Sequence, residues 1–589
     1  MNRGHVIPID PDAVLTVRSM KTEFALRTHT LKAVDDVSFT LKRGKTLCIV
    51  GESGSGKSVT ARSILRIVPE PGTITGGEVI LHREDGDVAL HTLGDRSKEI
   101  RAIRGADIAM IFQEPMSSLS PVHTIGFQID ESLRLHTDLD KKARRARIVE
   151  LLERVEIPDA ARTADRYPFE YSGGMRQRAM IAMALACNPK VLIADEPTTA
   201  LDVTTQAEIL DLIQELQDEY GMAVMFITHD MGVVAEIADE VAVMYRGQHV
   251  ETGGVEEIFA NPHEDYTKML IGSAVRLEEP SPIKIAMQAK VAALATRQPV
   301  LEVRDLVKQF KSKHTMLGKL VSTGVRAVDG VGLDLLPGET LGIVGESGSG
   351  KTTLGRCIMR MHEPTSGSIL YRGQGADTEV MSLDKKGLRD FHADVRMIFQ
   401  DPYASLNPRM TVEQLVAEPL RNRKLAAPTE IRDRVADLLV RVGLKPDHME
   451  RYPHAFSGGQ RQRIGIARAL APNPKVIIAD EATSALDVSL RSQILDLLLE
   501  FQRELDLSFI FISHDISTVR YFCDRVAVMY RGELVEIGNA REVCDNPTHA
   551  YTKALLSAVP RPDPTRRRIA NRHRYVAAET NNMSNGASA

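Results

Sequence analysis

Gly51-Glu52-Ser53-Gly54-Ser55-Gly56-Lys57-Ser58 follows the apolar run Leu47-Cys48-Ile49-Val50 and decides the fold of the first half of the chain. It matches the pattern G-x-x-x-x-G-K-[ST], in which glycines let backbone N–H groups surround phosphate oxygens. The pattern recurs as Gly345-Glu346-Ser347-Gly348-Ser349-Gly350-Lys351-Thr352. We expect the lysines, Lys57 and Lys351, to neutralise β- and γ-phosphate oxygens, and the hydroxyls of Ser58 and Thr352 to reach Mg²⁺.

Four further features come after each phosphate loop in the same order. They are a glutamine, a Ser-Gly-Gly segment, an Asp-Glu pair and a histidine: Gln113 and Gln400, Ser172-Gly173-Gly174 and Ser457-Gly458-Gly459, Asp195-Glu196 and Asp480-Glu481, His229 and His514. The lysines lie 294 residues apart, the glutamines 287 and the later features 285. Two ordered sets leave little room for chance, so the sequence predicts a tandem nucleotide hydrolase.

The Asp-Glu pairs predict the hydrolytic chemistry. Asp195 and Asp480 end apolar strands, where a buried carboxylate needs a cation, and we expect Mg²⁺ to supply it through water. Glu196 and Glu481 come directly after them. A glutamate next to the metal ligand can point at the γ-phosphate and orient or deprotonate the attacking water. Because both units keep this glutamate, neither site looks degenerate.

The glutamines and histidines complete each predicted site. The amides of Gln113 and Gln400 can contact both Mg²⁺ and water, and a proline-containing loop comes after each of them. His229 and His514 lie at the ends of apolar strands, from which an imidazole can reach the γ-phosphate.

The Ser-Gly-Gly segments predict that the two units meet. Such a helix start binds anions, yet each nucleotide already has a glycine loop in its own unit. The physical use of a second anion site is to bind the γ-phosphate of a nucleotide held by the other unit. The sequence therefore predicts a head-to-tail pair with two sites at one interface.

Length and composition set the organisation. The 589 residues divide into a first unit (1–275), a linker (276–298), a second unit (299–560) and a polar tail (561–589). Short apolar strands alternating with helices predict a parallel sheet covered on both faces, and a stretch rich in helix formers, 105–172, predicts a helical subdomain. Near balance between 74 basic and 79 acidic residues does not favour nucleic-acid binding. The chain lacks an apolar run of about 18 residues and a signal core, so we expect a cytoplasmic protein.

The ordered set resembles the ATP-binding cassette family over nearly all of residues 14–560. The resemblance implies two cassettes of the α/β class, each with a RecA-like phosphate-loop core, an antiparallel β-subdomain and a helical subdomain. It also implies ATP and Mg²⁺ as cofactors. One shared site would combine the Lys57 loop with Ser457–Gln460, and the other would combine the Lys351 loop with Ser172–Met175. The family's adenine-stacking aromatic would correspond to Phe24 and Phe310.

A finer resemblance lies after each cassette core. Asn261-Pro262-His263-Glu264-Asp265-Tyr266-Thr267-Lys268 and Asn546-Pro547-Thr548-His549-Ala550-Tyr551-Thr552-Lys553 look like an N-P-x-H-P-Y-T element of oligopeptide and dipeptide importer ATPases, although neither has the inner proline. The fusion order is similar to that of glutathione importers. The resemblance implies an ATPase subunit at the cytoplasmic face of the inner membrane that drives uptake of peptides, glutathione among the candidates. Relatives for nickel, sugars or opines share these motifs.

The same resemblance implies partners. Two integral-membrane permeases would bind the loops Glu114–Ser120 and Asp401–Asn407, where Met116 and Tyr403 are the candidate contacts, and a solute-binding protein would act through the permeases. The paired cassettes would replace a dimer of ATPase subunits, and no nucleic acid is implied. A basic cluster in the tail is either solvated or binds anionic lipid: Arg566, Arg567, Arg568, Arg572 and Arg574.

Sequence features distinguish this chain from three other classes of cassette protein. Ribosome-acting members carry a long charged helical linker, whereas this linker is short and contains prolines. DNA-repair members need zinc-type cysteine pairs, and the five cysteines here are widely scattered. Exporters with fused membrane spans need long apolar segments, which this chain lacks.

Overall fold

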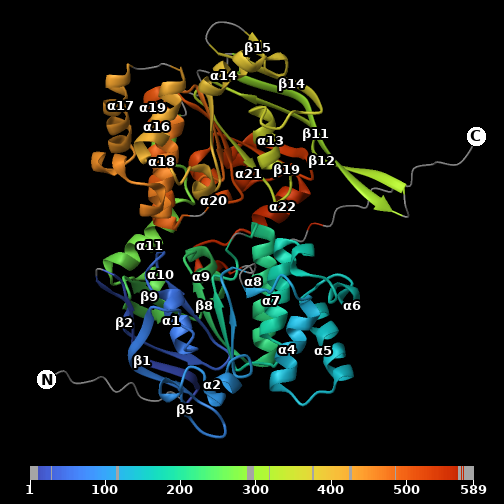
Figure 1. Cartoon of the computed structure of the whole chain (residues 1–589), viewed down its shortest axis with the longest axis vertical. Helices are drawn as coiled ribbons and strands as arrows, with labels where there is room; N and C mark the ends of the chain where they lie inside the picture. The colour runs from blue at the N-terminus through green and yellow to red at the C-terminus, as the bar shows by residue number, and fades with distance from the viewer. Residues whose placement is uncertain are drawn as a thin grey trace, which may run out of the picture.

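The structure is a computed structural model, and it describes residues 11–27, 29–114, 118–199, 201–287, 298–316, 319–373, 377–423, 427–484, 486–567, 572 and 575. Two α/β units lie one above the other, with the first unit below in Figure 1. Within these described residues, each unit has a six-stranded and a four-stranded sheet.

The first unit is built on a mainly parallel sheet in the order β10-β9-β3-β8-β7-β6. Every residue of its three central strands is buried, because helices cover both faces of the sheet. The four-stranded antiparallel sheet has the order β2-β1-β4-β5. The elements are β1 (Ala13–Ala25), β2 (Thr30–Lys42), β3 (Thr46–Val50), α1 (Lys57–Ile64), β4 (Gly72–Leu81), β5 (Val88–Ala89), α2 (Lys98–Ile103), β6 (Ile108–Ile111), α4 (Ile125–His136), α5 (Lys141–Arg154), α6 (Ala160–Thr163), η2 (Pro168–Glu170), α7 (Gly173–Ala184), β7 (Val191–Asp195), α8 (Val203–Tyr220), β8 (Ala223–Thr228), α9 (Met231–Ile237), β9 (Glu240–Tyr245), β10 (Gln248–Gly254), α10 (Val255–Ala260) and α11 (Asp265–Arg276).

The second unit repeats this plan, with a main sheet in the order β16-β17-β18-β13-β19-β20 and an antiparallel sheet in the order β12-β11-β14-β15. The predicted fold class, two tandem cassettes with β- and helical subdomains, is confirmed. The elements are β11 (Leu301–Met316), β12 (Lys319–Leu335), β13 (Thr340–Val344), α13 (Lys351–Ile358), β14 (Ser366–Arg372), β15 (Asp377–Glu379), α14 (Lys385–Asp394), β16 (Val395–Ile398), α15 (Pro402–Ser405), α16 (Val412–Arg423), α17 (Pro428–Arg441), α18 (Gly458–Leu470), β17 (Val476–Asp480), α19 (Val488–Leu505), β18 (Ser508–Ile512), α20 (Ile516–Phe522), β19 (Arg525–Tyr530), β20 (Glu533–Asn539), α21 (Ala540–Asp545) and α22 (Ala550–Ser557).

The helical subdomain of the first unit begins later than the sequence indicated. Within the stretch 105–172, β6 pairs in parallel with β7 and belongs to the main sheet. Its four residues form one buried apolar run, which a sheet edge covered by helices accommodates. Among the described residues of this stretch, the first helix of more than one turn is α4, which packs on α5 and α7.

The two units face each other head to tail. Figure 1 shows α1, which comes after the first phosphate loop, below α18 and α19 of the second unit. On the other side of the molecule, α13 lies above α7 and α8. Each phosphate-loop helix thus stands opposite the helices of the partner unit that begin at its Ser-Gly-Gly segment and after its Asp-Glu pair.

The linker packs onto the second unit, although its prolines indicated a simple break. Residues 282–287 form a helix, and Lys284 is buried. Its Nζ lies 2.7 Å from a carboxylate oxygen of Asp524 and donates to the hydroxyl of Thr340 at 3.0 Å and to Gln502 at 3.2 Å. Residues 288–297 of the predicted linker lie outside the described residues. The segment before them is therefore structurally part of the second unit.

The C-terminal tail comes after the second unit but packs onto the first unit. Arg572 forms ion pairs with Asp211 at 2.7 Å and with Glu236, and Arg567 donates to the carbonyl oxygen of Ala238. The side chains of Arg572 and Glu236 are almost fully buried in their pair. The expectation that the basic cluster is solvated or bound to lipid is therefore wrong for Arg572, because carboxylates of the first unit neutralise it. Arg568 and Arg574 lie outside the described residues.

Replacing Lys284 with Met should lower the free energy of unfolding of the second unit by about 3 kcal/mol, because Asp524 would stay buried without its cation. The matched control is Lys45→Met in the first unit. Lys45 binds the corresponding Asp239 at 3.0 Å but is mostly exposed, so its loss should cost less than about 1 kcal/mol. Calorimetry that resolves the two units measures both changes. Equal losses would contradict the buried role of Lys284.

Candidate active site

The phosphate loops owe their shape to glycines that no other residue can replace. Gly56 has φ of 101°, and a Cβ there would lie 2.2 Å from the carbonyl oxygen of Ala33. Gly350 has φ of 107°, and a Cβ there would lie 2.0 Å from the carbonyl oxygen of Ala327. Both conditions require glycine at the turn into α1 and α13. The spacing of glycines in the sequence therefore corresponds to a fixed backbone geometry.

The loop lysines are held inside their own loops. Lys57 Nζ donates to the carbonyl oxygens of Gly51 at 2.6 Å and Glu52 at 2.9 Å. Lys351 Nζ makes the equivalent bonds to Gly345 and Glu346 at 2.7 and 2.6 Å. Burial lowers the pKa of each lysine, while nearby carboxylates act in the opposite direction. The result is a desolvated ammonium group at the centre of each loop, where a phosphate would meet it.

Asp195 and Asp480 each accept a hydrogen bond from the hydroxyl next to the loop lysine. Ser58 donates to Asp195 at 2.8 Å, and Thr352 donates to Asp480 at 2.9 Å. Burial raises the pKa of both carboxyl groups, more than these hydroxyls lower it. Asp195 Oδ2 is buried and has no hydrogen-bond partner among the described residues. A buried oxygen of this kind marks a position where a cation would be stabilised.

Glu196 is the centre of a polar cluster in the first unit. It accepts hydrogen bonds from Gln113 Nε2 at 2.9 Å and Thr199 Oγ1 at 2.9 Å, and His229 Nδ1 lies 3.2 Å from its other oxygen. Burial alone would raise the pKa of Glu196, but His229, Thr199 and the charge of Lys57 outweigh it and lower the pKa to about 2. Glu196 also has φ of 48°, a left-handed conformation that glutamate rarely adopts and that occurs at functional sites.

Glu481 repeats this cluster with one difference. Gln400 Nε2 donates to its carboxylate at 2.8 Å, and His514 Nδ1 lies 3.2 Å away. Ser484 stands where the first unit has Thr199, but its hydroxyl donates to the backbone oxygen of Glu481. Burial again opposes the shift, and His514, Lys351 and Gln400 lower the pKa of Glu481. Its φ of 46° matches that of its counterpart.

Each phosphate loop contacts the other unit through its glutamate. The hydroxyl of Thr204 donates to the Glu346 carboxylate at 2.9 Å, and Ser489 donates to Glu52. The backbone N–H of Ser53 also donates to Asp487 Oδ1 at 3.0 Å. These contacts come from the starts of α8 and α19, which the sequence analysis did not single out. The repeated Ala-Leu-Asp-Val at 200–203 and 485–488 was the available signal.

The Ser-Gly-Gly segments lie beside these contacts. Ser172 and Ser457 cap α7 and α18 by accepting backbone N–H groups. A Cβ on Gly174 would lie 2.9 Å from the Thr205 side chain, next to the residue that touches the second phosphate loop. A Cβ on Gly459 would lie 3.3 Å from Leu490, next to Ser489. These segments therefore stand close to the partner unit's phosphate loop, as a shared site requires.

A cavity of about 530 Å³ lies between the units. Its walls bring together residues of both predicted sites that are far apart in sequence. Of the lining residues, Gln113, Glu196 and His229 belong to the first predicted site and His514 to the second, while Tyr403 and Asp487 belong to neither.

Two tyrosines that the sequence analysis did not assign accept hydrogen bonds from the backbone of the phosphate loops. The backbone N–H of Glu52 donates to the hydroxyl of Tyr266 at 2.9 Å, and that of Glu346 donates to Tyr551 at 3.1 Å. Both tyrosines belong to the repeated N-P element and lie 285 residues apart, so the repeat itself carried the signal. They are positioning residues for the loops.

The two proposed adenine-stacking aromatics lie on the antiparallel sheets. Phe24 is half-buried on β1, where its ring packs near Gly72. Phe310 on β11 is 42% exposed and meets His362 edge to face at 5.7 Å. Phe310 is the more exposed of the two rings, and Lys308 Nζ lies over it, 5.1 Å from the ring centroid. The stacking role of both aromatics stays a prediction.

Comparison with known proteins identifies the family. The family model described as ABC transporter matches residues 34–199 and 328–484, which include both phosphate loops and both Asp-Glu pairs. This chain belongs to the ATP-binding cassette transporter family. A second model, the oligopeptide/dipeptide transporter C-terminal region, matches residues 250–297 and 535–586, which include Tyr266 and Tyr551.

Relatives match the whole tandem arrangement. The chain is 50% identical over 579 residues to the glutathione import ATP-binding protein GsiA of Shigella dysenteriae, covering 96% of this chain and 92% of that protein. It is 50% identical over 570 residues to the protein of the same name in Pectobacterium atrosepticum, covering 94% and 90%. Among solved structures, cbiO1 from Clostridium perfringens, part of the ABC transporter complex cbiONQ, is 32% identical with a TM-score of 0.37, covering 42% of this chain and 92% of that one.

The family membership and the ATPase activity that the motifs predicted are thereby confirmed: the chain is an ATP-binding, ATP-hydrolysing protein with two cassettes. None of the helices in the part of the chain that the structure describes is long and apolar enough to cross a membrane.

Replacing Glu196 with Gln should leave ATP binding intact and lower hydrolysis at that site by about 10²- to 10⁴-fold, because an amide cannot accept the proton of water. Glu196→Gln combined with Glu481→Gln should trap ATP and hold the units together. Single-turnover hydrolysis and ATP retention on gel filtration measure these effects. Turnover of the double variant at the parent rate would contradict the role of both glutamates.

Proposed function

We propose that this chain is the energising subunit of an importer for peptides, with glutathione as the foremost candidate solute. The observation that carries the proposal is that two complete hydrolytic clusters meet across one interface. In addition, residues 250–297 and 535–586 match the C-terminal region of oligopeptide and dipeptide transporters. The name of the relatives supports glutathione. Dipeptides, nickel, sugars and opines are the alternative solutes for a chain of this class.

In the proposed reaction, the backbone N–H groups of each loop bind the ATP phosphates, and Lys57 or Lys351 neutralises their oxygens. Mg²⁺ would add positive charge that neutralises the β- and γ-phosphate oxygens. The unpartnered oxygen of Asp195 and the adjacent Ser58 hydroxyl have the chemistry to hold it in the first site. Thr352 and Asp480 are their counterparts in the second site. The amides of Gln113 and Gln400 would also contact the ion.

The glutamates align the attacking water. Because the pKa of Glu196 is about 2, its carboxylate is ionised at physiological pH and accepts a hydrogen bond from water. Gln113 and His229 fix the direction of this carboxylate by contacting both of its oxygens. The Ser-Gly-Gly helix start of the opposite unit would bind the γ-phosphate, so hydrolysis would require both units.

Gln113 and Gln400 would transmit the state of the nucleotide to the helical subdomains. Each amide contacts the catalytic glutamate and lies at the start of the loop that leads to the helices. Loss of the γ-phosphate would change this contact and shift the adjoining loop. A membrane permease bound to the loop would thereby be moved.

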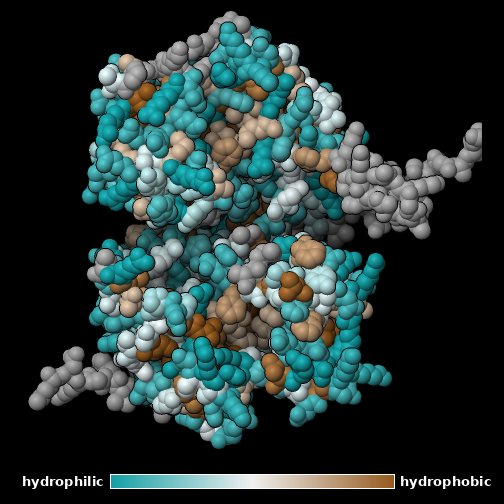
Figure 2. Space-filling view, viewed as in Figure 1, coloured by the Kyte–Doolittle hydropathy of each residue, from teal (hydrophilic) through white to brown (hydrophobic). Residues whose placement is uncertain are grey.

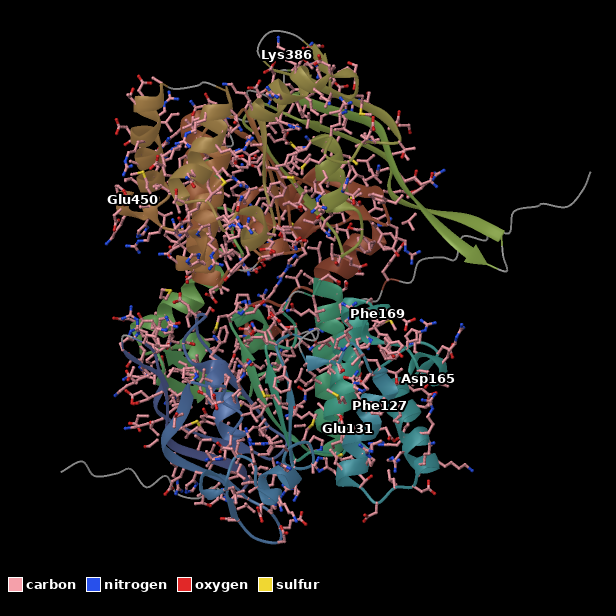
Figure 3. All side chains as sticks on the ribbon, in the orientation of Figure 1. Phe127, Glu131, Asp165, Phe169, Lys386 and Glu450 are labelled. Atoms are coloured by element: carbon pink, nitrogen blue, oxygen red, sulfur yellow. The ribbon has the colours of Figure 1, made fainter. Side chains whose placement is uncertain are left out.

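An exposed aromatic surface on the first helical subdomain fits such a permease. His123 stacks on Phe127 with ring centroids 4.7 Å apart, and Tyr167 stacks on Phe169 at 5.5 Å. Phe169 is 64% exposed, and Figure 2 shows apolar side chains gathered on this face of the first unit. Figure 3 shows Phe127 and Phe169 on neighbouring elements of the subdomain. Two exposed pairs of stacked aromatic rings on one subdomain favour a protein partner.

This surface continues from the loop 114–120, because the Ser120 hydroxyl lies 2.9 Å from His123 Nδ1. Met116 lies outside the described residues. In the second unit, Tyr403 is 66% exposed, and the guanidinium of Arg461 stacks on its ring at 3.7 Å. We propose that two permeases bind these loops at the cytoplasmic face of the inner membrane, and that a solute-binding protein acts through them.

Replacing Ser457 with Arg should abolish hydrolysis at the Lys57 site, 400 residues away in sequence. The added side chain would block the helix start that meets the γ-phosphate. The matched variant, Ser172→Arg, should instead affect the Lys351 site. Photo-crosslinked nucleotide trapped in each unit can be assigned by proteolysis. Loss confined to the variant's own unit would contradict the head-to-tail sites.

Replacing Phe127 and Phe169 with Asp should weaken binding to the permeases by about 10-fold or more, since each change would bury an unpaired charge in an apolar contact. ATP hydrolysis by the isolated protein should not change. Co-purification with the permeases and uptake of labelled glutathione and dipeptides measure the effect.

The control for this test is Lys386→Asp, on an exposed part of the second unit far from the aromatic surface in Figure 3. It should leave both recruitment and uptake unchanged. Normal recruitment of the Phe127 and Phe169 variant would remove this docking surface. Recruitment of the parent protein to ribosomes would contradict the proposed importer function.

A further inference from the structure

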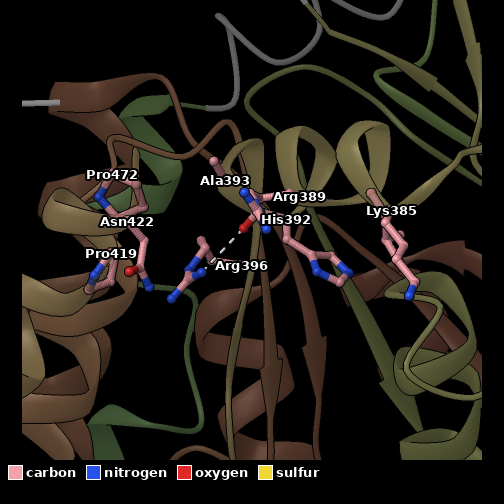
Figure 4. A pocket seen from close by; sticks show the side chains of 9 residues that line it. Lys385, Arg389, His392, Ala393, Arg396, Pro419, Asn422 and Pro472 are labelled. Atoms are coloured by element: carbon pink, nitrogen blue, oxygen red, sulfur yellow. Dashed lines mark hydrogen bonds between the residues drawn. The ribbon is translucent and has the colours of Figure 1, made fainter. Parts of the chain in front are cut away.

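A second cavity, of about 330 Å³, lies in the second unit away from both hydrolytic clusters. Its walls come from α14, from β16, from α16 and from the turn after α18. Figure 4 shows Arg396 between Pro419 and Asn422 on one side and the side chains of α14 on the other. The lining residues are Lys385, Leu388, Arg389, His392, Ala393, Arg396, Pro419, Asn422 and Pro472.

The charged residues of this cavity are all basic. Within the described part of the chain, no carboxylate lines it, and Lys385, Arg389 and Arg396 form no ion pair. Among the described residues, the buried Nε of Arg396 has no hydrogen-bond partner, and its Nη1 donates to the carbonyl oxygen of His392 at 3.3 Å. The Arg396 side chain is half-buried, and its enclosed Nε keeps unsatisfied capacity to donate to an anion.

The electrostatics of Arg396 point the same way. Burial lowers its pKa, the charge of Arg468 adds to that effect, and Glu418 opposes it. Glu418 does not line the cavity. An anion that entered the cavity would relieve both the desolvation of the guanidinium and its repulsion from Arg468.

The first unit lacks this arrangement. β6 corresponds to β16, and the position of Arg396 is taken by the buried Ala109. Gly105 and Ala102 stand where the second unit has His392 and Arg389. The first unit keeps a lysine, Lys98, at the position of Lys385, but it has no arginine at the positions of Arg389 and Arg396. Because the hydrolytic residues are kept in both units while these two arginines are not, the cavity is a feature of the second unit alone.

We propose that this cavity binds a small organic oxyanion, a phosphate or carboxylate on a short apolar body, with Arg396, Arg389 and Lys385 as its cationic partners. Leu388, Pro419 and Pro472 would contact the apolar body, and Asn422 would offer an amide. The cavity volume suits a molecule of metabolite size.

The location of the cavity would connect such a ligand to the second ATP site through the protein structure. β16 carries Arg396 and leads directly to Gln400, which donates to Glu481. α16 on the opposite wall belongs to the helical subdomain. A bound anion would therefore join the helical subdomain to the strand that positions Gln400.

The test is calorimetric titration of the full chain with its ATP sites saturated by a non-hydrolysable ATP analogue. The probes are inorganic phosphate, glycerol 3-phosphate and succinate, and phosphatidylglycerol vesicles form a separate arm. We expect at least one soluble probe to bind more tightly than about 1 mM. Arg389→Gln with Arg396→Gln should weaken that binding by about 10-fold or more.

The matched control is Lys98→Gln with Arg101→Gln on α2, the corresponding helix of the first unit, which should leave binding unchanged. Arg396→Lys keeps the charge and should retain most of the affinity, so a folding defect in the double variant would be recognised. Equal binding by the double variant and the parent would overturn the proposal. So would binding of vesicles alone, or no binding of any soluble probe.

Discussion

The contact between each phosphate loop and the opposite unit is the constraint on which the rest of the architecture depends. Glu52 and Glu346 lie inside the two glycine-rich loops, and their carboxylates accept hydrogen bonds from Ser489 and Thr204 of the partner unit. Each loop therefore has a hydrogen-bond donor in the opposite unit. The head-to-tail arrangement brings both contacts to one interface, beside the Ser-Gly-Gly helix starts.

Local features of the active sites could be predicted from the sequence, whereas contacts between distant segments could not. The glycine spacing determines the loop because the φ of Gly56 and the close approach of Ala33 exclude any side chain. The apolar runs before Asp195 and His229 likewise encode strands that deliver these side chains to one edge of the sheet. By contrast, the hydrogen bonds of Tyr266 and Asp487 to the phosphate loops depend on how elements more than 200 residues apart meet. In the sequence, only the recurrence of these two residues in both halves indicated that they have a role.

The two sites share a fold but not an identical environment. Thr199 donates to the carboxylate of Glu196, whereas Ser484 donates to a backbone oxygen. Asp487 reaches across to Ser53, while its counterpart Asp202 caps its own helix through the N–H of Thr205. The first site is therefore more tightly bound to the partner unit and holds its glutamate by one more hydrogen bond. Duplication preserved the chemistry, and side-chain choice at a few positions made the copies different.

The burial of Lys284 changes what the fusion of the two units means. In a chain cut just after this residue, the first polypeptide would end in a lysine whose carboxylate partner, Asp524, belongs to the second polypeptide. Separate subunits would then have to find each other while one carried an unpaired buried acid. Joining both in one chain removes that search, fixes a one-to-one ratio and excludes a pair made of two identical halves.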